Sequence, residues 1–187
     1  MRYSEQPNGV TAWQPSTWPE APLRWNSVFS SDLRGIFETT IVGELENVIT
    51  DAMQQNGGLA HRGHVVAIGL LCAVDAISAY GYGDKVGQRY EAFIRAHFTR
   101  GYAPFARNIY KAYRNSAVHS WHLFEVTILP GDESLREDGG IIAFGLLDFF
   151  DALKEALADF FKTLETSEEL QETVLRRYAR LRRTARR

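Results

Sequence analysis

The sequence is short of cysteine and of long hydrophobic runs, and both shortages narrow the class of protein. Cys72 is the one cysteine among 187 residues, which excludes an intrachain disulfide and with it the small disulfide-stabilised scaffolds. We expect Cys72 to be buried and to act as a small apolar filler in a reducing compartment. The first residues contain no apolar core of a signal peptide, and the longest apolar run, 65–79, contains Asp75 and is too short to cross a bilayer. We therefore expect a soluble, cytoplasmic protein without a membrane partner.

The usual motifs for cofactors and metals are also missing. The sequence has no glycine-rich phosphate loop and no acidic cluster at metal-binding spacing. Two pairs of histidines, His61 with His64 and His119 with His122, each place two imidazoles one helical turn apart. Zinc needs a third or fourth ligand, and a buried Cys72 cannot supply one. We therefore expect neither a metal nor another cofactor.

Acidic residues are absent from residues 176–187, which instead carry seven arginines. The rest of the chain contains 14 basic and all 23 acidic residues, so its net charge is −9, whereas the whole chain carries −2. An acidic body is not typical of a protein that grips nucleic acid over its whole surface, so we expect any contact with a polyanion to be local. The basic segment either binds RNA phosphates or forms a helix that closes on the acidic body of its own or a partner subunit.

Residues 1–30 differ in composition from the rest of the chain. They hold four of the six prolines and three of the four tryptophans. Prolines disfavour helices and central strands, whereas aromatic residues are rare in disordered tails. We therefore predict an extended strap at 1–30 that lies on the body or on a partner subunit, followed by a helical domain at 31–166 and a basic C-terminal helix at 167–187.

Apolar residues recur at helical spacing through most of the remaining chain, which predicts a mainly α, antiparallel helical bundle. Cap-forming residues at 30–32 open the first helix. The second helix is apolar almost all round, so we expect it to be the buried centre of the bundle. Residues 166–169 have the spacing of a capping box and open the last helix. The predicted helices span residues 31–55, 62–80, 85–98, 103–122, 146–164 and 167–187.

One β-structured insertion interrupts the predicted bundle. Residues 123–129 are rich in β-branched and aromatic side chains and end at a Pro-Gly-Asp turn. A polar loop and a second apolar segment at 140–144 follow. We therefore predict a β-hairpin at about 123–145, inserted before the helix that begins at residue 146.

The helix predicted at 103–122 carries a polar face without a single acid. Placed at about 100° per residue, its basic and amide side chains fall on one side, and its apolar residues fall on the other. Every amphipathic helix has a wet side, but such a side usually mixes acids with bases, so this one also suits anion binding. The polar face comprises Arg107, Asn108, Lys111, Arg114, Asn115, His119 and His122.

Within this polar face, Asn115 follows Arg114, and His119 lies five residues after Arg114. The Arg–His spacing alone is a weak pattern, and the asparagine makes it much rarer by chance. The stretch around it, over roughly residues 35–165, resembles the HEPN superfamily (higher eukaryotes and prokaryotes nucleotide-binding), whose helical bundles carry an Arg and, about four to six residues later, a His. The resemblance implies a homodimeric, metal-independent endoribonuclease with Arg114, Asn115 and His119 as catalytic residues. Many members of the superfamily also pair with an antitoxin-like protein partner.

These three residue types suit RNA cleavage without a metal. RNA carries its own nucleophile, the 2′-hydroxyl, so cleavage needs a base for that proton, here His119, and a cation near the phosphorus. The guanidinium of Arg114 can hold two phosphate oxygens in a fork, and Asn115 orients the imidazole or the substrate. The product would carry a 2′,3′-cyclic phosphate. Because Arg114 and His119 point about 140° apart on the helix, we expect a two-fold partner to bring a second pair across a cleft.

Several residues keep more than one interpretation. Lys111 and His122 are expected to assist substrate binding. Asp75 is either a hydrogen-bonded core carboxylate or a group that neutralises Arg114 or orients His119. The alternative functions are a non-catalytic helical dimer that binds a nucleotide or a partner protein, and a plain scaffold in which the motif is a coincidence.

Overall fold

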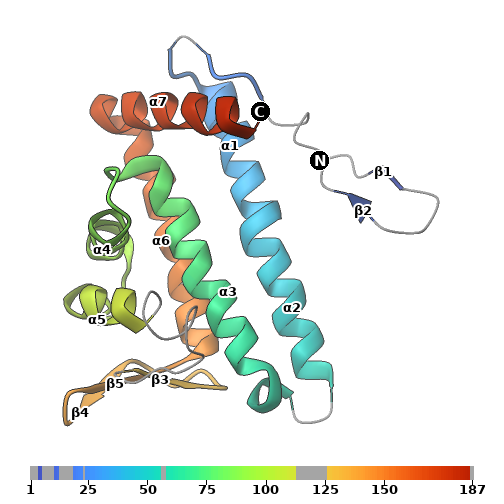
Figure 1. The fold of residues 1–187 in the computed structure, drawn as a ribbon, viewed down its shortest axis with the longest axis vertical. Helices are drawn as coiled ribbons and strands as arrows, with labels where there is room; N and C mark the ends of the chain where they lie inside the picture. Colours follow the sequence, from blue (N-terminus) through green and yellow to red (C-terminus); the bar gives the residue numbers. More distant parts are fainter. Residues whose placement is uncertain are drawn as a thin grey trace.

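The computed structural model describes residues 4–5, 11–12, 19–22, 24–55, 58–112 and 126–185. Over these residues the chain is mainly helical, with a small three-stranded sheet at one end of the long helices (Figure 1). The predicted mainly α class is therefore confirmed. The helices are α1 (Ser27–Ile36), η2 (Phe37–Val42), α2 (Gly43–Gln54), α3 (Gly58–Gly81), α4 (Val86–His97), η3 (Ala103–Phe105), α5 (Ala106–Lys111), α6 (Leu146–Thr166) and α7 (Glu168–Ala185). The strands are β1 (Ser4–Glu5), β2 (Thr11–Ala12), β3 (Val126–Leu129), β4 (Arg136–Asp138) and β5 (Ile141–Gly145).

The first predicted helix is a continuous rod made of α1, the π-helical turn η2, and α2. It begins at Ser27, earlier than predicted, because Asn26 caps it: the Asn26 Oδ1 accepts a hydrogen bond from the Phe29 N–H at 2.8 Å. The prediction that residues 30–32 form the cap is wrong, since these residues lie inside the first turns of α1. Several cap-forming residues follow one another here, and the extended backbone at Asn26 decides which one is used.

Helix α3 runs antiparallel to α2 through the middle of the bundle and packs against α2, α4, α6 and α7 (Figure 1). The prediction that this helix is the buried centre of the bundle holds for one side only, because a stripe of the helix faces solvent. Val65 is 57% exposed, and Cys72 is exposed rather than buried. By length and composition, residues 62–81 are the one helical stretch of the described chain apolar enough to cross a membrane. Less than half of this stretch is buried in the fold. The other side of α3 forms the core, with Val66, Leu70, Val74 and Ile77 almost inaccessible.

The sheet differs from the predicted hairpin. Its strand order is β3-β5-β4, with β3 parallel to β5 and β4 antiparallel to β5. The hairpin is therefore the pair β4–β5, whose turn is Gly139–Gly140 with φ of 57° and 84°. All three residues of β4 are exposed, so this strand has no alternation of apolar side chains to reveal it in the sequence. The prediction that residues 123–129 and 140–144 pair as a hairpin is wrong.

Glycine makes the junction from β5 to α6 possible. A Cβ on Gly145 would lie 2.5 Å from the Gly131 carbonyl oxygen and 2.5 Å from the Glu133 nitrogen. The Gly145 N–H donates to the Glu133 carbonyl at 2.7 Å. The loop 131–133 is thus held against the start of α6, which closes this end of the bundle.

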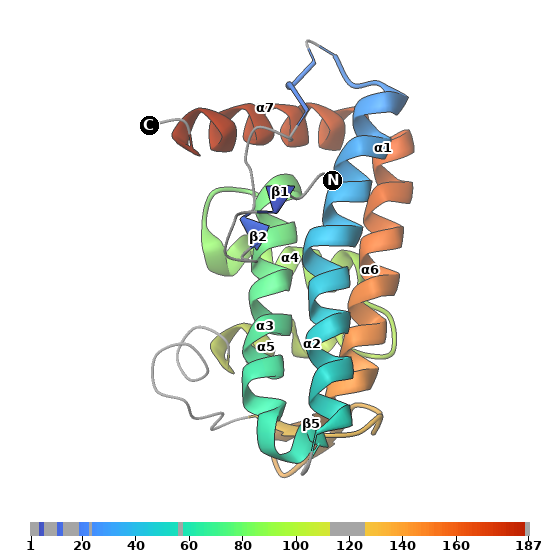
Figure 2. The ribbon, with the colours of Figure 1, turned by 90° about the vertical axis from the view of Figure 1, so that its right-hand side faces the viewer.

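Helix α7 lies across the opposite end of the bundle (Figures 1 and 2). Its cap is Ser167, one residue after the predicted start of the capping box, and the Ser167 Oγ accepts from the Leu170 N–H. The Pro19 carbonyl accepts from the Tyr178 hydroxyl and from Arg182, both at 2.6 Å. The described end of the proline-rich segment therefore lies on α7, and residues 27–30 of the predicted strap belong to α1.

Candidate functional site

The described part of the acid-free polar face is α5, and its two sides differ as the sequence predicts. Ala106 and Ile109 are fully buried, whereas Arg107 and Lys111 are exposed and Asn108 is half-buried. The assignment of faces is therefore confirmed for residues 106–111. This face presents two cations to solvent in its first two turns.

Close packing against α4 holds α5 in this orientation. A Cβ on Gly87 would lie 2.8 Å from the Tyr110 ring, so the missing side chain makes room for that ring. The rings of Tyr90 and Tyr110 lie 5.4 Å apart. Because Ile109 and Tyr110 anchor the inner side, α5 cannot rotate its cationic side inward without losing these contacts.

The residues predicted to be catalytic, Arg114, Asn115 and His119, lie outside the described residues, as does His122. Their roles stay predictions. Of the predicted site residues, Lys111 and Asp75 are described, on α5 and α3 respectively.

Asp75 forms an ion pair that joins α3 to α4. Its Oδ1 accepts from the Arg89 Nη2 at 2.8 Å and from the Arg89 Nε at 3.3 Å. Both side chains are largely buried, with 22% of Asp75 and 15% of Arg89 exposed. Of the two interpretations of Asp75, the hydrogen-bonded carboxylate is thus observed, and a contact with Arg114 or His119 falls outside the described residues. Arg89 was not among the predicted residues, since its partner is 14 positions away.

A second polar group, which the sequence does not reveal, is a hydrogen-bonded chain of Tyr82, His97 and Asp159. The Tyr82 hydroxyl donates to the His97 Nε2 at 2.5 Å, and the His97 Nδ1–H donates to Asp159 at 2.7 Å. This hydrogen-bonded chain connects the residue after α3 with the last residue of α4 and with α6. The His97 side chain is 2% exposed, whereas that of Asp159 is 47% exposed.

Tyr82, His97 and Asp159 are hydrogen-bonded in the same order as a nucleophile, its general base and the carboxylate that orients the base. The pKa shifts of Tyr82 and His97 nevertheless favour a structural role. Burial lowers the pKa of His97, against the opposing effect of Asp159, so the imidazole is neutral at pH 7. Burial, with a smaller contribution from the charge of Asp159, raises the pKa of Tyr82 to about 12, which keeps the phenol protonated. The hydrogen-bonded chain therefore ties the end of α3 to α4 and α6 through the buried His97.

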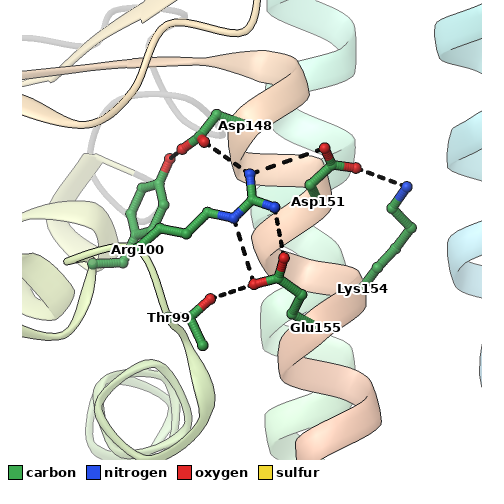
Figure 3. Close-up of polar contacts among 7 residues, drawn as sticks. Thr99, Arg100, Asp148, Asp151, Lys154 and Glu155 are labelled. Atoms are coloured by element: carbon green, nitrogen blue, oxygen red, sulfur yellow. Dashed lines mark hydrogen bonds and ion pairs between the residues drawn. The ribbon is translucent and has the colours of Figure 1, made fainter.

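A third polar group surrounds Arg100 in the turn after α4 (Figure 3). The guanidinium donates to Asp148 at 2.9 Å and to Glu155 at 2.5 Å, and Asp151 lies 3.9 Å away. All three acids project from one side of α6, where Figure 3 shows them around the arginine. Arg100 has φ of 57°, a left-handed conformation unusual for a side chain of this size, and these contacts hold it there.

Two further donors complete the Arg100 cluster. The Tyr102 hydroxyl donates to Asp148 at 2.7 Å, and Thr99 donates to Glu155. Burial and the bond to Asp148 raise the pKa of Tyr102, while the bonds from Arg100 and Thr99 lower the pKa of Glu155. Lys154 pairs with Asp151 at 2.8 Å, so each of the three acids has a cationic partner. The Arg100 cluster therefore fixes the turn to α6.

Metal ligands do not gather in the described part of the chain, where no group of three or more His, Cys, Asp or Glu could hold an ion.

Comparison with known proteins adds no neighbour: no family model matches the chain, and no curated protein or solved structure matches it significantly. Functional inference therefore depends on this chain's own residues.

Proposed function

We propose that the protein is a HEPN-like homodimer that acts in the cytoplasm as a metal-independent endoribonuclease. The observation that supports this most directly is α5, which is anchored by its apolar side and turns Arg107 and Lys111 outward. These are the first residues of the acid-free face that continues in the sequence to Arg114 and His119. A cationic surface at this position suits the phosphates of an RNA strand.

In the proposed reaction, His119 removes the proton of a ribose 2′-hydroxyl, and the resulting oxygen attacks the adjacent phosphorus. The 5′-oxygen of the next nucleotide leaves and takes up a proton, from the His119 imidazolium or from water, so the products are a 2′,3′-cyclic phosphate and a 5′-hydroxyl end. Arg114 stabilises the extra negative charge on the phosphorus oxygens, and Asn115 positions the base or the substrate. Lys111 and His122 bind neighbouring phosphates. The two-fold axis brings a second set of these residues to the same cleft.

The test is cleavage of a structured RNA by the full chain in the presence of EDTA. A positioned general base contributes about 10²- to 10⁴-fold, so His119→Ala should slow cleavage by that factor. A substrate with a single 2′-deoxy linkage should resist cleavage at that linkage alone. Arg136→Ala, an exposed arginine on β4, is the matched control and should leave the rate unchanged.

Equal cleavage by the parent and by His119→Ala, or cleavage of the 2′-deoxy linkage, would reject the ribonuclease proposal. The oligomeric state should be measured by sedimentation on the same samples. A strictly monomeric protein would contradict the shared cleft.

A further inference from the structure

A cavity of about 650 Å³ lies between α7 and the turn that links α3 to α4. The turn, residues 81–84, forms one wall, and α7 forms another. Four arginines of α7 line the cavity, and we call it the arginine pocket: Arg176, Arg177, Arg180 and Arg183.

The position of these arginines follows from how α7 is docked. Arg176, Arg180 and Arg183 are spaced at i, i+4 and i+7, so they project from one side of the helix. Val174 is buried and Tyr178 is 2% exposed, so other sides of α7 pack on the core and on the Pro19 carbonyl. The helix therefore cannot turn the arginines away from the cavity.

The opposite wall of the cavity, the turn at 81–84, is also fixed by its contacts. A Cβ on Gly81 would lie 2.7 Å from the Phe160 ring, so the turn sits directly on α6. Tyr82, the next residue, is bonded to the buried His97. The cavity thus lies between two fixed elements, as in preformed ligand sites, which typically measure about 300–1,000 Å³.

Basic groups outnumber acidic ones in the lining of the arginine pocket. The four guanidiniums face two carboxylates, those of Asp84 and Glu169. Asp84 accepts from Arg177 at 2.6 Å and from Arg180 at 3.2 Å, although its side chain is 70% exposed. The Asp84 carboxylate is therefore already bound by two guanidiniums of the arginine pocket. Arg176 and Arg183 are both exposed: Arg176 donates to the Thr173 hydroxyl at 3.5 Å, and neither arginine forms an ion pair with a carboxylate of the described residues.

We propose that the arginine pocket binds a compact anion with two or more adjacent phosphates, either inorganic or as part of a nucleotide. Guanidinium forks bind phosphate oxygens in pairs, and several arginines on one side of a helix match several linked phosphates better than a single charge. The rest of the chain is acidic, with a net charge of −9 before residue 176, which disfavours a long polyanion running beyond the pocket. Asp84 occupies part of the site and weakens binding until the ligand displaces it.

The arginine pocket is separate from α5, which is the described part of the proposed ribonuclease site. Helix α7 lies across one end of the bundle, whereas α5 lies toward the end that carries the sheet (Figure 1). The inference therefore does not depend on RNA cleavage: pyrophosphate binding without cleavage of RNA supports the pocket and rejects the ribonuclease proposal alone.

The experiment is calorimetric titration of the full chain at about 150 mM salt with pyrophosphate, tripolyphosphate and a nucleoside triphosphate. The parent should bind with saturable 1:1 stoichiometry. The double variant Arg176→Ala/Arg183→Ala should lose about tenfold or more in affinity, because charge-assisted hydrogen bonds are removed. Arg136→Ala, the exposed arginine of β4, should bind as the parent does.

Asp84→Asn provides an independent test, since it removes a competing carboxylate and leaves every arginine in place. Its affinity for pyrophosphate should rise several-fold. Circular dichroism and the melting temperature check that each variant is folded. Tighter binding of the nucleoside triphosphate than of tripolyphosphate would identify a nucleotide as the source of the phosphates, and equal binding would identify inorganic polyphosphate. Both results support the site.

Any of these outcomes would overturn the proposal: no saturable binding, unchanged affinity in the double variant, an equal loss in Arg136→Ala, or weaker binding by Asp84→Asn. Tight binding of a single-stranded RNA that pyrophosphate does not displace would also overturn it, in favour of an extended RNA surface.

Discussion

The Arg100 cluster and the arginine pocket both contain guanidiniums at the surface of the bundle. Carboxylates outnumber arginines in the cluster, whereas arginines outnumber carboxylates in the pocket. One arginine faces three carboxylates in the Arg100 cluster (Figure 3), whereas four arginines face two carboxylates in the pocket. Every acid of the Arg100 cluster has a cationic partner, since Lys154 also pairs with Asp151 at 2.8 Å, and these ion pairs hold the turn to α6. In the pocket, by contrast, only Arg177 and Arg180 pair with a carboxylate of the described residues, so the other two guanidiniums can bind an anionic ligand. The comparison shows that an arginine's role here is set by its neighbours.

The largest expected effect is the loss of Asp148 from the Arg100 cluster. Asp148→Ala leaves the buried Tyr102 hydroxyl without its acceptor and Arg100 without its most buried partner. We expect the free energy of unfolding to fall by about 2–4 kcal/mol. Urea denaturation measures it.

The matched control is Asp151→Ala, on the same helix and beside the same arginine. Asp151 lies 3.9 Å from Arg100 and is 48% exposed, so this change should cost no more than about 0.5–1 kcal/mol. Similar losses in both variants would show that burial does not distinguish the two acids.

The buried chain of Tyr82, His97 and Asp159 predicts an intermediate, pH-dependent effect. Burial lowers the pKa of His97 below its ordinary value of 6.5, so below pH 6.5 the unfolded chain binds more protons at this residue than the folded chain. Stability from this group is complete above pH 6.5 and falls as the pH drops toward 5, by at most about 1.4 kcal/mol per pH unit. Urea denaturation between pH 7 and pH 5 measures the slope.

His97→Gln removes the titrating group and should flatten the slope in this pH range. Glu155, whose pKa is lowered, loses stabilisation only below about pH 4.5 and so does not interfere. A slope that persists in His97→Gln would assign the effect to another group.

The smallest expected change in stability is in the arginine pocket. Without a ligand, Arg176→Ala/Arg183→Ala should alter the free energy of unfolding by less than about 0.5 kcal/mol, because both side chains are exposed. Thermal denaturation with and without pyrophosphate measures this. A large loss of stability without ligand would show that Arg176 and Arg183, like Arg100, stabilise the fold.

How far the sequence predicts the fold depends on whether the signal is local. The helices predicted at 85–98 and 146–164 match α4 and α6 to within two residues, since apolar spacing and flanking glycines mark them directly. Strand pairing was predicted wrongly because β4 is wholly exposed, and the parallel pairing of β3 with β5 leaves no sequence signal. The exposure of Cys72 depends on which sides of α3 its neighbours cover.

The candidate sites divide in the same way. The acid-free face of α5 was predictable because residues on one helix have a known angular relation. The arginine-rich segment was visible in the sequence as a basic helix, but its cavity was not, since Asp84 meets Arg177 across 93 positions. The buried chain through His97 and the acids around Arg100 were missed for the same reason.

The order of residues along the chain is enough to predict that it forms amphipathic helices, that one of them carries a polar face without acids, and that its last segment is basic. Each of these follows from side chains within a few turns of one another. Which charges are neutralised and which remain in excess depends on the fold, because the electrostatics of a guanidinium depend on the carboxylates that folding brings within a few ångströms and on how much water it removes.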